Sequence, residues 1–85
     1  MDKLTEAVQI LIVEDEADFR SLLEMRLKRK GYSILSAASG EEALRLASDH
    51  TFDLALVDIR LPGMNGLQVL EVIRQLEPPP EVLMM

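Results

Sequence analysis

The fold is decided by a short apolar stretch near the N-terminus, Val8-Gln9-Ile10-Leu11-Ile12-Val13, which is followed directly by three acids, Glu14-Asp15-Glu16. A short, almost continuous apolar run of this kind is typical of a strand that is buried on both faces of a parallel sheet. The stretch Leu54-Ala55-Leu56-Val57 repeats this pattern and is also followed by an acid, Asp58. The sequence therefore predicts two buried strands, each with acids directly after its last residue.

Two further strands and three helices are predicted around this pair. A weaker apolar run at Tyr32–Ala37 predicts an outer strand, and Glu81–Met85 predicts the start of a fourth strand. The apolar spacing predicts helices over Ala17–Lys30, after the capping-box residues Ser39-Gly40-Glu41-Glu42, and from about Gly66 to Leu76, where three prolines end the third helix. The residues expected to face the core are Phe19, Leu22, Leu23 and Leu27 in the first helix, Ala43, Leu44 and Ala47 in the second, and either Leu70, Ile73 and Leu76 or Val69 and Val72 in the third.

This alternation of strands and helices with short connections predicts the fold class. Right-handed crossovers between successive strands make the sheet parallel and place helices on both of its faces, which defines a doubly wound α/β domain. A length of 85 residues allows one small domain, which we assign to residues 8–85 after an N-terminal tail over residues 1–7.

The composition argues against several classes of function. Nine Lys and Arg against fifteen Asp and Glu give a net charge of −6, whereas direct nucleic-acid binding requires basic patches. No apolar run approaches the ~20 residues of a membrane span, and the polar N-terminus does not resemble a secretory signal. The lack of cysteine removes disulfides and thiolate metal sites and fits a reducing compartment. We therefore expect a cytoplasmic domain that contacts neither nucleic acid nor membranes.

The acids that follow the two buried strands form the candidate site. Ligands of a parallel sheet bind outside the carboxyl ends of its strands. If the two strands are neighbours, Glu14, Asp15 and Asp58 converge at one edge, where their repulsion either forces a proton onto one carboxyl or is relieved by a divalent cation. A set of oxygen ligands suits Mg²⁺. The alternative is that these acids are ordinary solvated loop charges.

The connection after Asp58 is unusually rich in turn residues. They are Pro62, which fixes φ, Gly63 and Gly66, which permit positive φ, and Asn65, which can cap the next helix. A rigid loop of this kind would hold the Asp58 side chain and the Arg60 carbonyl in a fixed relation to a metal. An ordinary β-turn would explain the same residues.

Three blocks of sequence closely resemble the receiver domain of bacterial two-component response regulators. They are Ile10–Glu16, Ala38–Leu44 and Asp53–Gly66, in this order, and the match extends over Val8–Met85. The resemblance implies a flavodoxin-like sheet, whose strand order is 2-1-3-4-5. The chain resembles roughly the first two thirds of such a domain, so we expect the order 2-1-3-4 without the fifth strand and the last two helices.

The resemblance also implies a function and a role for each candidate residue. Asp58 resembles the aspartate that accepts a phosphoryl group from a sensor histidine kinase or phosphotransfer protein, after which the signal is relayed to an output. Asp15 would bind Mg²⁺ directly, Glu14 would act through water or a hydrogen bond, and the Arg60 backbone carbonyl would be a further ligand. Glu14 stands where the family more often has Asp, but it keeps the charge. The domain would be a signalling switch and not an enzyme.

The end of the chain leads to two further expectations. The family has a Ser or Thr at the end of the fourth strand and a Lys at the end of the fifth, and both would come after Met85. Without that lysine, phosphorylation of Asp58 in this chain is expected to be slow or undetectable, because a cation that clamps the phosphoryl group is lost. The open fourth strand and the apolar surface of the first helix predict a homodimer.

Other classes of protein fit these residues less well. A Mg²⁺-dependent aspartyl-phosphate hydrolase has a second acid two residues after its nucleophile, where this chain has Arg60. A dinucleotide-binding domain has glycines after its first strand, where Glu14 and Asp15 would repel a pyrophosphate. The single histidine, His50, is expected to be a solvated residue at the end of the second helix rather than a phosphodonor. A module that dimerises without taking a phosphoryl group stays open as the alternative function.

Overall fold

The computed structural model describes residues 8–85, and the predicted tail over residues 1–7 lies outside the described residues. Strands and helices alternate along the chain. They are β1 (Gln9–Val13), α1 (Ala17–Arg29), β2 (Ser33–Ala37), α2 (Gly40–Asp49), β3 (Leu54–Val57), α3 (Gly66–Ile73) and β4 (Glu81–Met84). None of the helices within residues 8–85 combines the length and apolar character that crossing a membrane requires.

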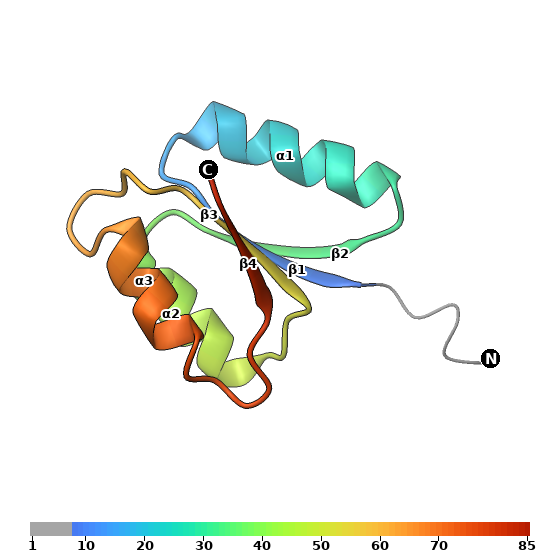
Figure 1. Cartoon of the computed structure of the whole chain (residues 1–85). Helices are drawn as coiled ribbons and strands as arrows, with labels where there is room; N and C mark the ends of the chain where they lie inside the picture. Colours follow the sequence, from blue (N-terminus) through green and yellow to red (C-terminus); the bar gives the residue numbers. More distant parts are fainter. Residues whose placement is uncertain (1–7) are drawn as a thin grey trace.

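The strands form one parallel sheet in the order β2-β1-β3-β4, which confirms the predicted α/β fold (Figure 1). The central strand β1 pairs with β2 on one side and with β3 on the other, so that Val13 stands opposite both Ala37 and Val57. Figure 1 shows α1 on one face of the sheet and α2 with α3 on the other. The register therefore aligns the carboxyl ends of β1, β2 and β3 along one rim.

The side chains of β1 alternate between two hydrophobic clusters, one on each face of the sheet. Ile10 and Ile12 pack with Ile34 on the face covered by α1. Leu11 and Val13 belong to a larger cluster on the opposite face, whose other buried members are Ala37, Ala43, Phe52, Ala55, Val57, Leu61, Val69 and Ile73. Because both faces of β1 are buried, its sequence is an almost unbroken apolar run.

α1 has the predicted bounds to within one residue, but only part of its predicted apolar face is buried. It ends before Gly31, whose positive φ (97°) suits the residue that follows a helix. Leu23 and Leu27 pack against the sheet, whereas Phe19 and Leu22 are exposed, so the prediction for these two residues was wrong. α1 is the only helix on its face within residues 8–85, so no neighbouring helix covers its flanks.

α2 begins at the predicted cap with one change in its hydrogen bonds. The Ser39 hydroxyl accepts from the Glu42 N–H (3.1 Å), as in a capping box. The Glu42 carboxylate, however, accepts from the N–H of Ala38 (2.9 Å) and not from that of Ser39. The residues predicted to face the core do so, with two buried and one half-buried: Ala43, Ala47 and Leu44.

α3 is shorter than predicted, and its core face differs from both predicted sets. It ends at Ile73, well before the prolines. Val69 and Ile73 are fully buried, whereas Val72 is 42% exposed. The buried face thus combines one residue from each predicted set, because contact with α2 and β3 decides which side of α3 is covered.

Candidate functional site

The site lies where the register of the sheet brings two strand ends together. Val13 at the end of β1 pairs with Val57 at the end of β3, and the Asp58 N–H donates a hydrogen bond to the Val13 carbonyl (2.9 Å). Glu14 and Asp15 therefore leave the sheet beside Asp58. Carboxylate oxygens from these three acids all lie within 4.8 Å of one another. The structure thus brings together the three acids that the sequence pattern singled out.

Glu14 is the acid that the fold encloses. Its exposed fraction is only 5%, whereas Asp58 is half-buried and Asp15 is exposed. Burial raises the pKa of the Glu14 carboxyl above its usual range, and the hydrogen bond from the Glu16 N–H acts against this rise. The charge of Asp58, a hydrogen bond with Asp58 and the charge of Asp15 raise this pKa further. The site therefore concentrates negative charge around a carboxyl that has lost much of its water.

The turn from β1 to α1 is held by hydrogen bonds to both the side chain and the backbone of Glu14. Its Oε2 accepts from the Glu16 N–H (3.0 Å), and the Glu16 side chain caps α1 by accepting from the Phe19 N–H (2.7 Å). The Glu14 carbonyl accepts from the Arg20 guanidinium (2.9 Å). Sequence reasoning missed these contacts, because an acid before a helix and an arginine one turn later are too common to indicate a site without the fold.

The connection from β3 to α3 holds Asp58 in place. The Arg60 N–H donates to Asp58 Oδ1 (2.9 Å). Gly63 adopts the positive φ that a glycine permits (69°), whereas Gly66 does not. A Cβ on Gly66 would instead overlap the Asp58 carbonyl oxygen and lie 2.7 Å from the Cα of Ile59. Gly66 is therefore required because the start of α3 packs directly against the backbone at Asp58.

Asn65 ends this connection by capping α3, as the sequence predicts. Its Oδ1 accepts from the Gln68 N–H (3.0 Å), and the Gln68 side chain accepts from the Asn65 N–H (2.9 Å). This reciprocal pair is a complete capping box. The segment after Asp58 is thus fixed at both of its ends.

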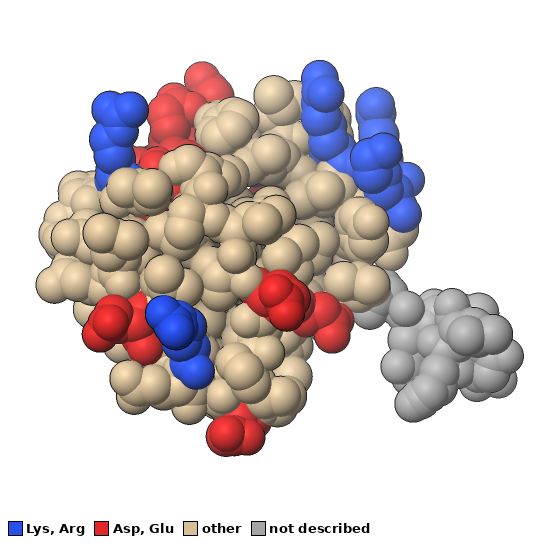
Figure 2. All heavy atoms as spheres, in the orientation of Figure 1, with Lys and Arg blue, Asp and Glu red and all other residues tan. Residues whose placement is uncertain are grey.

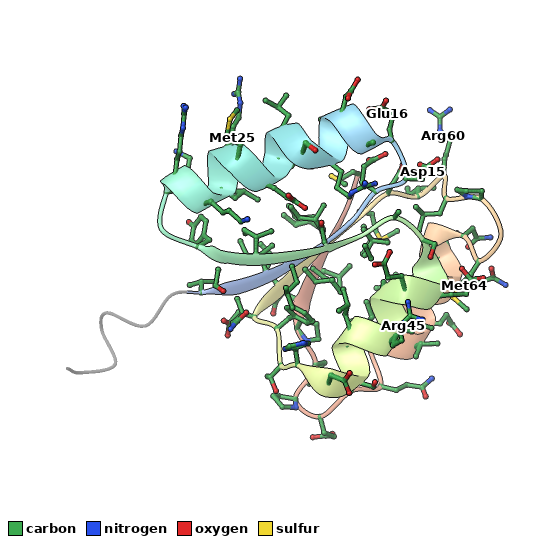
Figure 3. All side chains as sticks on the ribbon, turned by 180° about the vertical axis from the view of Figure 1, so that it is seen from behind. Asp15, Glu16, Met25, Arg45, Arg60 and Met64 are labelled. Atoms are coloured by element: carbon green, nitrogen blue, oxygen red, sulfur yellow. The ribbon has the colours of Figure 1, made fainter. Side chains whose placement is uncertain are left out.

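Charged side chains lie at both ends of α1, with both signs at its start and basic residues in its last turn. Asp15, Glu16 and Arg60 lie at the rim where α1 begins (Figure 3). Figure 2 shows a group of basic side chains over the other end of α1, whose last turn contains Arg26, Lys28 and Arg29. The only lysines within residues 8–85, Lys28 and Lys30, lie at this far end of α1.

The donor set of the rim fits a hard divalent cation. Mg²⁺ prefers oxygen ligands, takes one or two carboxylates and keeps several of its waters. The exposed Asp15 and half-buried Asp58 could supply direct ligands and leave room for water. Glu14, with one oxygen engaged by Glu16, could act through its other oxygen or through water. The Arg60 carbonyl stays a predicted ligand.

Comparison with known proteins assigns the chain to a family. Residues 10–85 match the response regulator receiver domain, and the chain belongs to this family. It is 38% identical over 84 residues to the transcriptional regulatory protein ResD of Bacillus subtilis, covering 99% of this chain and 35% of that protein. The crystal structure of a CheY-like receiver domain protein from Methanospirillum hungatei is similar with a TM-score of 0.89 at 34% identity, covering 93% of this chain and 63% of that one.

Another similar protein is the response regulator TrrA of Thermotoga maritima. Its structure in complex with Mg²⁺-BeF has a TM-score of 0.84 at 38% identity and covers 91% of this chain and 67% of that one. Its structure in complex with the histidine kinase ThkA has a TM-score of 0.82 at the same identity, 38%, and covers 91% of this chain and 66% of that one. The chain is therefore a receiver domain of two-component response regulators, as the resemblance implied. The module that only dimerises is not favoured.

The chain spans about two thirds of the length of these solved receivers and about a third of the length of ResD. The slow phosphorylation and the homodimer expected from the sequence stay predictions.

Proposed function

We propose that this receiver domain accepts a phosphoryl group on Asp58 in a Mg²⁺-dependent reaction. The observation that carries the proposal is the convergence of carboxylate oxygens of Glu14, Asp15 and Asp58 within 4.8 Å at the paired ends of β1 and β3. The Mg²⁺-BeF complex of TrrA, which belongs to the same family, supports it.

Each acid has a distinct part in this proposal. Asp15 and Asp58 would hold the ion directly, Glu14 would act through water or a hydrogen bond, and the Arg60 carbonyl would be a further ligand. When bound, Mg²⁺ offsets the negative charge of the carboxylates and of the incoming phosphoryl group. The Arg60 N–H holds Oδ1 of Asp58 and so orients the carboxylate for attack.

The proposed transfer is a displacement at phosphorus. A carboxylate oxygen of Asp58 forms a bond to phosphorus while the bond from phosphorus to an imidazole nitrogen of a phosphohistidine breaks. The electron pair of the broken bond stays on the imidazole, which then takes up a proton. The product is an acyl phosphate, and its hydrolysis would restore Asp58 and release inorganic phosphate.

The donor in this proposal is a sensor histidine kinase or a phosphotransfer protein. The complex of TrrA with the kinase ThkA supports a partner of this class. The phosphorylated receiver would pass its signal to an output domain or a partner protein. Control of transcription is one such output, since ResD is a transcriptional regulatory protein.

Incubation with acetyl phosphate and Mg²⁺, followed by mass spectrometry, tests this function. We expect one phosphoryl group to be added to Asp58 over hours. No phosphoryl group should be added when EDTA replaces Mg²⁺, or to the variant Asp58→Asn. Asp49→Asn changes an exposed acid at the end of α2 and should behave like the wild type. Incorporation that persists in Asp58→Asn, or that needs no Mg²⁺, would contradict the proposal, and so would no incorporation at all.

A further inference from the structure

Arg20 makes a contact with the site that the proposed chemistry does not use. It lies one turn into α1 and is half-buried. Its guanidinium donates to the carbonyl oxygen of Glu14 (2.9 Å). Its own N–H donates to the Glu16 carbonyl (2.9 Å), which is part of the first turn of the helix. Arg20 therefore connects α1 to the turn that carries the acids.

The carbonyl that Arg20 holds belongs to the peptide bond between Glu14 and Asp15. This peptide is planar, so fixing its oxygen also fixes the direction in which the Asp15 backbone leaves β1. On the other side of the same residue, the Glu14 N–H donates to the Ala37 carbonyl (3.0 Å) and fixes the end of β1 to β2. With the Glu16 N–H on the Glu14 carboxylate, the backbone and side chain of Glu14 are held at three points.

We propose that Arg20 is a positioning residue, which holds Glu14 and Asp15 in the geometry that binds Mg²⁺. The proposal rests on the Mg²⁺ site proposed above. Metal ligands must be placed within a fraction of an ångström, and their own hydrogen-bond partners provide this precision. Arg20 acts through the backbone and touches no metal or phosphoryl group.

A role of Arg20 through its charge and a role through positioning predict opposite changes in Mg²⁺ affinity when Arg20 is replaced. The two roles can therefore be separated by experiment. A guanidinium beside the acids repels a cation, so removing its charge alone would strengthen Mg²⁺ binding. Removing the hydrogen bond to the Glu14 carbonyl would loosen the acids and weaken Mg²⁺ binding. A merely structural role would lower the stability of the fold and leave the affinity of the folded fraction unchanged.

The experiment is a calorimetric titration of the whole chain with Mg²⁺, combined with thermal unfolding in EDTA. For Arg20→Gln we expect a dissociation constant about tenfold higher than that of the wild type. Arg20→Lys can still donate one hydrogen bond from its cation, so we expect an intermediate value. The control Arg26→Gln removes the same charge from the exposed last turn of the same helix and should leave the dissociation constant unchanged.

A second measurement on the wild type does not depend on the variants' folding. The guanidinium protons of Arg20 should give separate, slowly exchanging NMR signals with and without Mg²⁺, whereas those of Arg26 should be averaged. Averaged Arg20 signals would overturn the proposal, as would Arg20→Gln binding Mg²⁺ as tightly as the wild type or more tightly. If the wild type itself does not bind Mg²⁺, the proposed metal site fails as well, so the two failures are distinguishable.

Discussion

At the scale of single residues, this receiver contains a buried acid, Glu14, among other acids. A buried carboxylate is costly unless it is hydrogen-bonded, paired or protonated. The Glu14 carboxylate accepts a hydrogen bond from the Glu16 N–H, but the charges of Asp58 and Asp15 both act against its ionised form. Its burial therefore raises the pKa of the Glu14 carboxyl when no cation is bound, and a bound cation would act in the opposite direction.

This residue gives a pH prediction for the cation-free protein. Because the pKa of Glu14 is raised in the folded state, the folded chain binds this proton more tightly than the unfolded chain. Its contribution to stability is fully present below the ordinary carboxyl pKa and is lost as the pH rises through the raised value. In EDTA, Glu14→Gln should therefore gain stability relative to the wild type as the pH rises through this window, measured by urea unfolding.

The matched control is Glu71→Gln, which changes an exposed acid on α3. It should show no such change relative to the wild type across the same window. A wild-type protein that gains stability over Glu14→Gln as the pH rises would contradict the burial of a charged Glu14. Added Mg²⁺ should reduce the stability advantage of Glu14→Gln at neutral pH. A ligand that binds only the folded state stabilises it, and the wild type, which keeps Glu14, should bind Mg²⁺ more tightly than the variant.

At the scale of elements, the segment from β3 to α3 determines where Asp58 stands. The start of α3 touches the backbone of Asp58 and Ile59 at Gly66, and the capping box at Asn65 fixes the direction of the helix. The site thus depends on a close helix–strand contact as well as on its acids.

Gly66→Ala tests this contact. The added methyl group would overlap backbone atoms, which cannot move as a flexible side chain can. We expect a loss of about 2–3 kcal/mol in the free energy of unfolding, and weaker Mg²⁺ binding because Asp58 is displaced. Gly63→Ala in the same segment has space for its Cβ and should lose only about 1 kcal/mol, the cost of its positive φ. Equal losses in the two variants would argue against the close-packing role of Gly66.

At the scale of the whole molecule, the sheet is covered unevenly. α2 and α3 lie on one face and α1 alone on the other, while β4 is an edge strand within residues 8–85 (Figure 1). Several large apolar side chains on α1, on β4 and at the residue after it are exposed: Phe19, Leu22, Met25, Leu83 and Met85. An edge strand with apolar side chains can pair with a strand of another chain.

We therefore expect the 85-residue chain to form a twofold dimer through β4. Leu83→Lys should weaken the dimer about tenfold, equal to about 1.4 kcal/mol, because the charge would be buried in the paired edge. Leu67→Lys is a matched control, since Leu67 on α3 is 56% exposed and Leu83 is 57% exposed. Sedimentation equilibrium measures both. A monomeric wild type, or equal weakening by both variants, would contradict pairing at this edge.

The sequence by itself determined the elements of this receiver and the composition of its rim. The runs ending at Val13 and Val57 are apolar on both faces. This local property identifies two buried parallel strands, and the acids come directly after them in the sequence. The Asn65 cap depends on three or four neighbouring residues and was predicted for the same reason. With a helix between successive strands and short connections, right-handed crossovers then make the strands of the sheet parallel.

Only the tertiary structure decided what depends on contacts between distant segments. Periodicity shows that a helix has an apolar side, but the neighbours of α3 bury Val69 and Ile73 and leave Val72 exposed. The role of Gly66 as a point of contact, and the reach of Arg20 to the Glu14 carbonyl, likewise depend on how a helix sits against a strand end. The physical reason is that backbone and capping preferences act over a few residues, whereas packing selects among the faces that those preferences allow.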